Sequence, residues 1–118
     1  MNNPIAIVTG GAGFIGSHMV DLLLSEGYEV RVLDNFSGGH KRNLEQHAQN
    51  PLLHVQKVDI CELVSRDNLF KGAKYIFHFA GIGDIVPSIE KPADYMNTNV
   101  QGTVRVLEAA RTAEIEKF

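Results

Sequence analysis

The chain has 118 residues, a length suited to one domain with one core. Apolar residues make up 44% of it and charged residues 21%, as in ordinary soluble domains, and a net charge of −3 offers no basic surface for nucleic acid. No apolar run approaches the roughly 18 residues of a membrane span, and the N-terminus lacks a secretory pattern. Cys61 is the single cysteine, which excludes an internal disulfide. We therefore expect a cytoplasmic protein with neither membrane nor nucleic-acid partners.

Short apolar runs alternate with helical patterns along the chain. Ile5–Thr9 is typical of a buried strand, and Phe14–Glu26 predicts a helix with Ile15, Met19, Leu22 and Leu23 on its apolar face. The segments that follow are predicted as a strand at Glu29–Asp34, a turn-rich stretch at Asn35–His40, a weak helix at Lys41–Gln49, a strand at Leu53–Val58, a short helix at Glu62–Phe70, a strand at Tyr75–Ala80, a loop at Gly81–Pro92 and a long helix at Ala93–Ala113.

This alternation predicts the fold class. Strands separated by helices pair in parallel through right-handed crossovers. We therefore expect an α/β fold, a Rossmann-type parallel sheet with helices on both faces and the strand order 3-2-1-4. The long helix is expected to face the core with Val100, Val104, Leu107 and Ala110.

A glycine run lies between the first predicted strand and the first predicted helix. Its spacing is Gly10-x-x-Gly13-x-x-Gly16. Glycines there permit a tight turn and a close approach of the backbone to phosphate oxygens, and the following helix N-terminus adds unpaired N–H groups. The run predicts binding of a dinucleotide pyrophosphate. The alternative is an ordinary strand-to-helix turn with packing glycines.

Two carboxylates end the next strands. Asp34 lies 18 residues after Gly16, where an Asp accepts hydrogen bonds from the adenosine ribose and repels a 2′-phosphate, so it favours NAD over NADP. Arg42 is close enough in sequence to leave NADP open, and a solvated loop Asp is the alternative. Asp59 could accept from the adenine amino group while Ile60 covers the ring, or Asp59 could simply cap a helix before Glu62.

The motifs together carry a family resemblance. They are Thr9-Gly10-Gly11-Ala12-Gly13-Phe14-Ile15-Gly16-Ser17-His18, Asp34-Asn35, Asp59-Ile60, His78-Phe79-Ala80-Gly81 and Asn97-Thr98-Asn99-Val100-Gln101-Gly102-Thr103, in this order. The chain resembles the extended short-chain dehydrogenase/reductases, in particular the NAD-dependent nucleotide-sugar epimerases and dehydratases. The UDP-glucose 4-epimerases are the most similar type, and the resemblance covers essentially the whole chain.

The resemblance implies a role for each matching residue. Gly10, Gly13, Phe14 and Ile15 would line the pyrophosphate, and Asp34, Asn35, Ser37 and Gly38 would hold the adenosine ribose and its phosphate. Asp59 and Ile60 would frame the adenine, and Phe79, Ala80 and Gly81 would pass under the nicotinamide ribose. Asn99 would tie the long helix to the fourth strand, and Ser88 would flank the sugar pocket.

The chain departs from the family pattern in two places. Gly83 stands where UDP-glucose 4-epimerases often carry a cofactor-contacting Lys, and the loop around it looks more like that of the wider group, which includes glucuronate epimerases, decarboxylases and dehydratases. The family's base is a Tyr followed four residues later by a Lys that lowers its pKa. Here the residues four after Tyr28, Tyr75 and Tyr95 are Val, Phe and Asn.

The chain is therefore expected to be a dinucleotide-binding N-terminal part, residues 1–118, without a catalytic residue, a metal site or a substrate domain of its own. It stops where the fifth strand should begin. The alternative is a natively short NAD-binding or regulatory module. If the chain is truncated in this way, the fourth strand should be an open edge and the last helix should lack part of its partner surface, so we expect self-association or a homodimer. His78 is expected to be a hydrogen-bonded core histidine, and Cys61 to be inert.

Overall fold

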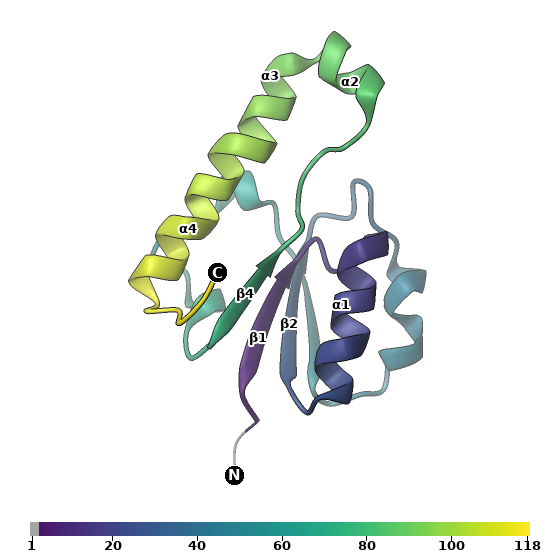
Figure 1. Cartoon of the computed structure of the whole chain (residues 1–118), viewed down its shortest axis with the longest axis vertical. Coiled ribbons are helices and arrows are strands. Elements are labelled where there is room, and N and C mark those ends of the chain that lie inside the picture. Colours follow the sequence, from purple (N-terminus) through teal and green to yellow (C-terminus); the bar gives the residue numbers. More distant parts are fainter. Residues whose placement is uncertain (1–2) are drawn as a thin grey trace.

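A computed structural model describes residues 3–118 and shows one parallel sheet (Figure 1). Its four strands are β1 Ile5–Thr9, β2 Glu29–Asp34, β3 Leu53–Lys57 and β4 Tyr75–His78, in the order β3-β2-β1-β4. The predicted order is confirmed. The register pairs Thr9 with Leu33 on one side and His78 on the other. The carboxyl ends of β2, β1 and β4 therefore meet at one edge of the sheet.

Helical segments connect the strands. They are α1 Phe14–Ser25, the 3₁₀ segments η1 Lys41–His47, η2 Ile60–Glu62 and η3 Asn68–Phe70, the helices α2 Ile85–Glu90 and α3 Pro92–Tyr95, the π-helical segment η4 Met96–Gln101, and α4 Gly102–Thr112. The last three form one continuous rod that extends beyond the sheet (Figure 1). The single long helix expected over 93–113 is therefore present, with a π-helical stretch inside it.

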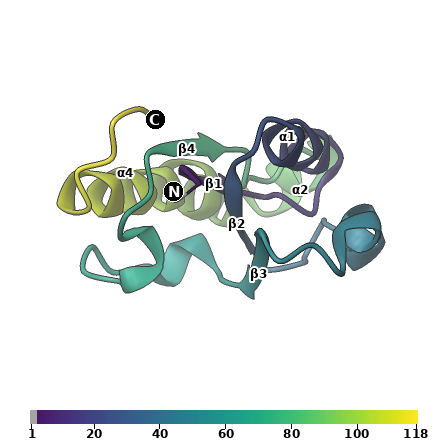
Figure 2. The same cartoon turned by 90° about the horizontal axis from the view of Figure 1, so that it is seen from below.

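Helices cover both faces of the sheet, as predicted (Figure 2). Side chains alternate along a strand, so β1 contributes Ala6 and Val8 to one core cluster and Ile7 to the other. The first cluster lies under α1 and η1, and includes Val20 and Leu44. The second lies under α4 and the 3₁₀ segments η2 and η3.

The faces that α1 and α4 bury differ from the prediction. On α1 the buried residues are Gly16, Ser17, Val20 and Leu23, whereas Ile15 and Leu22 are exposed. On α4 they are Gly102, Val106, Ala109 and Ala110. Val100, Val104 and Leu107 were expected in the core, but they are 50%, 44% and 44% exposed. At Gly102 the absence of a side chain leaves room for Ile60. A Cβ on Gly102 would lie 2.7 Å from Ile60 Cδ1.

Two segments also differ in secondary structure. The short helix expected at 62–70 is replaced by η2 and η3, which are separated by extended backbone at Leu63. The loop expected at 81–92 contains the helix α2. Among the described residues, no helix is long and apolar enough to cross a membrane, and no group of His, Cys, Asp and Glu is arranged to hold a metal ion.

The outer edge of β4 is not entirely open. Tyr75 forms a parallel bridge with Lys117, and the Ile76 N–H donates to the Lys117 carbonyl at 3.0 Å. The expectation of a wholly open edge was therefore wrong, because Lys117 pairs with the outer edge of β4 at Tyr75 and Ile76.

Candidate functional site

The glycine turn brings the end of β1 against the loop that follows β4. Gly10 has a φ of +68°, and a Cβ on it would lie 2.7 Å from the Ala80 nitrogen and 2.8 Å from the Phe79 carbonyl carbon. A Cβ on Gly16 would overlap the Gly10 carbonyl oxygen. Glycine is thus required at both positions, for close backbone approach. Two segments that sequence analysis assigned to the same cofactor lie in direct contact.

Helix α1 begins at this turn, and no side chain caps its N-terminus. Gly13 is the N-cap residue, no side chain accepts a hydrogen bond from the first turn, and the first turn contains no acidic residue. The first N–H groups of a helix have no partner within it, and they carry partial positive charge. Phe14 and Ile15, the first two helical residues, are 79% and 65% exposed. This arrangement fits a phosphate group, which would accept hydrogen bonds from those N–H groups.

Asp34 lies at the end of β2, beside the turn. Its Oδ2 accepts from the Ala12 N–H at 2.9 Å, and its Oδ1 accepts from the Phe36 N–H at 2.8 Å. The residue is 8% exposed. Each carboxylate oxygen can accept a further hydrogen bond. Asp34 is therefore a positioned anion able to accept from a ribose diol, and it is not the freely solvated loop residue of the alternative interpretation.

The loop after Asp34 carries the other residues assigned to the ribose and its phosphate. The Asn35 Oδ1 accepts from the Ser37 N–H at 3.0 Å and from the Ser37 hydroxyl at 2.8 Å. Asn35, Ser37 and Gly38 are all exposed. Phe36, between them, has a φ of +62°, which is uncommon for a bulky residue.

A partly buried network of hydrogen bonds joins β1, β4 and the last helix. The Thr9 hydroxyl is 2.6 Å from His78 Nδ1, and it accepts from the Phe79 and Ala80 N–H groups at 3.1 and 3.2 Å. On the other side of the ring, His78 Nε2 is 3.0 Å from the Thr103 hydroxyl. That hydroxyl donates to the Asn99 carbonyl at 2.7 Å.

These bonds fix the His78 tautomer. The Thr103 hydroxyl donates its only proton to the Asn99 carbonyl. It must therefore act as the acceptor toward His78, whose Nε2 carries the proton. Nδ1 then accepts from the Thr9 hydroxyl, whose lone pairs face two backbone N–H groups. A proton on Nδ1 as well would give the Thr9 hydroxyl oxygen three donors to accept from, the ring and two backbone N–H groups. Burial also lowers the pKa of His78 below its ordinary value. His78 is therefore a neutral, hydrogen-bonded histidine.

Asn99, in the π-helical segment, fixes the loop after β4. Its Oδ1 accepts from the Ile82 N–H at 2.8 Å, and its Nδ2 donates to the Ile82 carbonyl at 2.9 Å. Gly81 leaves room for this contact, since a Cβ there would lie 3.0 Å from the Asn99 Oδ1. Together with Thr9, the Asn99 amide sets the path of Phe79, Ala80 and Gly81.

Two of the residues assigned to the adenine and the sugar, Ile60 and Ser88, lie in surroundings that differ from those expected. Asp59 caps η2, with its Oδ1 accepting from the Cys61 N–H at 2.9 Å. The Ile60 side chain is only 4% exposed and is directed against Gly102, so it does not supply the apolar cover expected over the adenine. Only its backbone could contribute to such a site. Ser88 lies within α2, not in a loop, and its hydroxyl donates to the Ile85 carbonyl at 2.5 Å.

The surroundings of Tyr95 and Cys61 do not activate them for acid–base or nucleophilic chemistry. The Tyr95 hydroxyl is buried without a hydrogen-bond partner, and burial, with a contribution from Asp84, raises the pKa of Tyr95. A catalytic base near neutral pH would need the opposite shift. Burial likewise raises the pKa of Cys61.

Sequence reasoning missed Ala12, Thr9 and Thr103 as parts of the site. The Ala12 contribution is a backbone N–H, which leaves no mark in the sequence. Thr9 and Thr103 could have been noticed, because each is a hydroxyl residue inside one of the motifs that carry the family resemblance.

Comparisons with known proteins agree with this geometry. Residues 6–118 match the NAD dependent epimerase/dehydratase family. The chain belongs to this family. Across 122 aligned residues it is 36% identical to UDP-glucose 4-epimerase of Bos taurus, and the match covers 95% of this chain and 35% of the bovine protein. The chain thus spans about a third of this epimerase.

Solved structures of epimerase/dehydratase proteins superpose on the whole fold. UDP-N-acetylglucosamine 4-epimerase from Methanobrevibacter ruminantium is 30% identical, with a TM-score of 0.87 over 98% of this chain and 36% of that protein. The dTDP-glucose 4,6-dehydratase DesIV from Streptomyces venezuelae, solved with NAD bound, is 37% identical, with a TM-score of 0.85 over 95% of this chain and 37% of that protein. The family is NAD dependent, which confirms the cofactor predicted from Asp34 and the glycine turn.

Proposed function

We propose that this chain is the NAD-binding part of an enzyme that epimerises or dehydrates a nucleotide-linked sugar. The observation that carries the proposal is the convergence of the uncapped α1 N-terminus, the buried Asp34 carboxylate and the loop after β4 on one glycine turn. Relatives that act on UDP- and dTDP-linked sugars support the substrate class.

In this proposal each part of the site has its own task. The N–H groups at the start of α1 bind the pyrophosphate, with Gly10 and Gly13 shaping the turn and Phe14 and Ile15 flanking it. Asp34 accepts from the adenosine ribose, and Asn35, Ser37 and Gly38 border it. Asp59 and the Ile60 backbone lie toward the adenine, and Phe79–Gly81 supports the nicotinamide ribose. NAD, when bound, accepts a hydride from the carbon of a sugar hydroxyl.

The proton step needs residues beyond those described. The sequence contains no Tyr with a Lys four positions later, and the pKa of Tyr95 is raised. We therefore propose that residues 1–118 bind and orient the cofactor while another segment supplies the base and most of the sugar pocket. Ser88, on α2, is the candidate sugar contact within this chain. The Ser88 hydroxyl already donates to the Ile85 carbonyl, so it would accept a hydrogen bond from the sugar.

Thermal unfolding and an activity assay test the proposal together. A ligand that binds only the folded state raises its stability by about 2.7 kcal/mol at 100 times its Kd. Saturating NAD should raise the melting temperature of this protein, and addition of UDP-glucose should give no epimerised or dehydrated product. An unchanged melting temperature would count against cofactor binding. Turnover would count against a base supplied from outside the chain.

We also propose that the protein self-associates through the last helix. Met96, Val100, Val104 and Leu107 follow one another at spacings of four, four and three residues, and all are 44–60% exposed. Residues at such spacings form one stripe on a helix. The row is an apolar surface that two copies of the chain could bury between them.

A further inference from the structure

The outer edge of β3 is open to solvent. β3 is an edge strand of the sheet, and its residues 54–57 are all exposed, whereas β1 is buried from Ala6 to Thr9. Figure 2 shows β3 at the end of the sheet opposite β4, with no ribbon of residues 3–118 beyond it. Unpaired N–H and C=O groups at such an edge form a template for pairing with another strand.

The register of β3 decides which of its backbone groups are free. The Leu52 carbonyl and the Val58 N–H bond to β2, at 2.8 and 3.0 Å. In a parallel pair, alternate residues direct their backbone groups to the same neighbour, so the even-numbered residues of this segment face β2. Val55 and Lys57 therefore direct both N–H and C=O away from the sheet. Within residues 3–118, these groups have no hydrogen-bond partner across the outer edge.

This edge is complementary to a second copy of itself. In an antiparallel pair with its two-fold axis at Val55, each residue of 53–57 faces a residue of the other β3, and any other centre leaves some of them unpaired. Val55 then faces Val55 of the second copy, and Lys57 faces Leu53, so no like charges are opposed. The Val55 N–H donates to the Val55 carbonyl and the Lys57 N–H to the Leu53 carbonyl, and the two-fold axis repeats both bonds.

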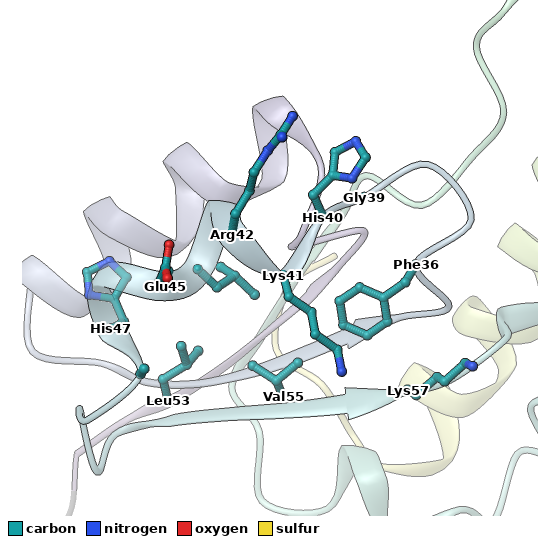
Figure 3. Close-up of a pocket in the computed structure, with 12 residues that line it drawn as sticks. Phe36, Gly39, His40, Lys41, Arg42, Glu45, His47, Leu53, Val55 and Lys57 are labelled. Carbon is teal, nitrogen blue, oxygen red and sulfur yellow. The ribbon is translucent and has the colours of Figure 1, made fainter.

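The charges beside β3 suit the same arrangement. Glu45 lies over the Leu53 half of the strand, and Lys41 lies over the half that ends at Lys57 (Figure 3). Within residues 3–118, none of these three charged groups has an opposite charge within 4.0 Å. Antiparallel pairing brings the Lys57 end of one copy to the Glu45 end of the other. The two copies thus attract each other at both ends of the contact.

We propose that two copies of this chain pair antiparallel through β3 and join their sheets into one. The contact is distinct from the exposed row on the last helix, and it does not depend on the cofactor. Its strength comes from a few exposed backbone hydrogen bonds, each with a modest net contribution. The dimer is therefore weak, with a Kd on the order of 1 mM.

Cysteine cross-linking tests the contact and its register. The two-fold axis places the Val55 Cα atoms of two copies about 5.5 Å apart, within the range that a disulfide spans. In a C61S/L107E background, which removes the native thiol and weakens the contact of the last helix, V55C should form a disulfide dimer under mild oxidation. Q56C in the same background is the matched control. Its Cα atoms would be roughly 7–8 Å apart, so it should cross-link about tenfold more slowly.

A backbone variant tests the hydrogen bonds themselves. Val55→Pro removes the outward N–H and leaves the bonds to β2 in place, and proline is tolerated on an edge strand in this orientation. Val55→Thr keeps the N–H and is the control. In sedimentation equilibrium of the L107E protein, the proline variant should raise the Kd of dimerisation roughly tenfold or more, because the axis doubles the loss.

Three results would overturn the proposal. One is an L107E protein that stays wholly monomeric at about 1 mM, where a substantial dimer fraction is expected. Another is cross-linking of V55C and Q56C at equal rates, which would indicate random collision. The last is equal dimerisation of folded Val55→Pro and Val55→Thr, which would place the contact elsewhere on the surface.

Discussion

The Asp34 carboxylate accepts a hydrogen bond from the Ala12 backbone N–H at 2.9 Å, and this bond joins the end of β2 to the glycine turn after β1. The same carboxylate accepts from Phe36, so one buried anion fixes both the turn and the loop that would border the ribose. The geometry of the turn therefore depends on one side chain, and we propose that the choice of cofactor depends on the same side chain.

Replacing Asp34 with Asn should reverse the preference for NAD over NADP or remove it. The amide loses the negative charge that repels a 2′-phosphate, and its NH₂ group cannot accept from a ribose hydroxyl. Hydrogen bonds to charged groups contribute about 1.5–3 kcal/mol, so the Kd for NAD should rise roughly ten- to hundredfold. Titration calorimetry with both dinucleotides gives the ratio directly.

The matched control is Glu108→Gln, which removes a carboxylate on α4 that pairs with Arg111 at the surface. This variant should bind both dinucleotides as the unmodified protein does. An NAD to NADP ratio that stays constant in Asp34→Asn would show that Asp34 does not select the cofactor.

Replacing Gly16 with Ala should destabilise the protein. The added methyl would overlap the Gly10 carbonyl oxygen, so α1 would have to move away from the turn. Such overpacking costs typically 1–3 kcal/mol. Urea unfolding measures the loss, and Gly83→Ala is the control, because a Cβ on Gly83 meets nothing within 4 Å. Equal midpoints for the two variants would mean that the turn is less tightly packed than described.

The His78 network should make stability depend on pH. Burial lowers the pKa of His78 in the folded protein, whereas unfolding restores it to about 6.5. Below that value the unfolded chain binds more protons than the folded chain, so the free energy of unfolding falls as the pH drops from about 6.5 toward the folded pKa. Above about pH 6.5 this contribution is fully present.

The variant His78→Gln isolates that contribution. A Gln side chain has one acceptor and one donor group but does not titrate in this range. Urea unfolding between about pH 7.5 and 5.5 should show a smaller loss of stability in the variant than in the unmodified protein. Parallel curves would rule out His78 as the source of the pH dependence.

Leu107→Glu should weaken self-association if the exposed row on the last helix is the contact. A charge placed in an apolar interface is strongly unfavourable without a partner. Light scattering should show an associated species for the unmodified protein and a smaller mass for the variant. Glu114→Gln, past the end of α4, is the control. A monomer for the unmodified protein at high concentration would contradict the proposal.

The positions of the strands could be predicted because each strand is marked by its own short run of apolar residues. Ile5–Thr9 and Glu29–Asp34 have the same bounds in the sequence analysis and in the structure, since apolar runs bounded by Gly and Asp are typical of buried parallel strands. The order of the strands followed from the alternation with helices.

The buried faces of the helices were only partly predictable by apolar spacing, which found Leu23 and Ala110 but not the residues around them. The contact of α4 with η2 is made by Gly102, because Ile60 fills the space where a Cβ would lie. Hydrophobic periodicity weights large side chains, so it selected Val104 and Leu107, which are exposed. In the site, Asp34 was found from its spacing, whereas its partner is a backbone N–H at Ala12, which only the fold reveals.

Titration calorimetry of the unmodified protein with NAD and with NADP tests the central claim most directly. The uncapped α1 N-terminus and the positioned Asp34 carboxylate predict one NAD site per chain and weaker binding of NADP. Absence of NAD binding by a folded sample, or tighter binding of NADP than of NAD, would contradict this account of the site.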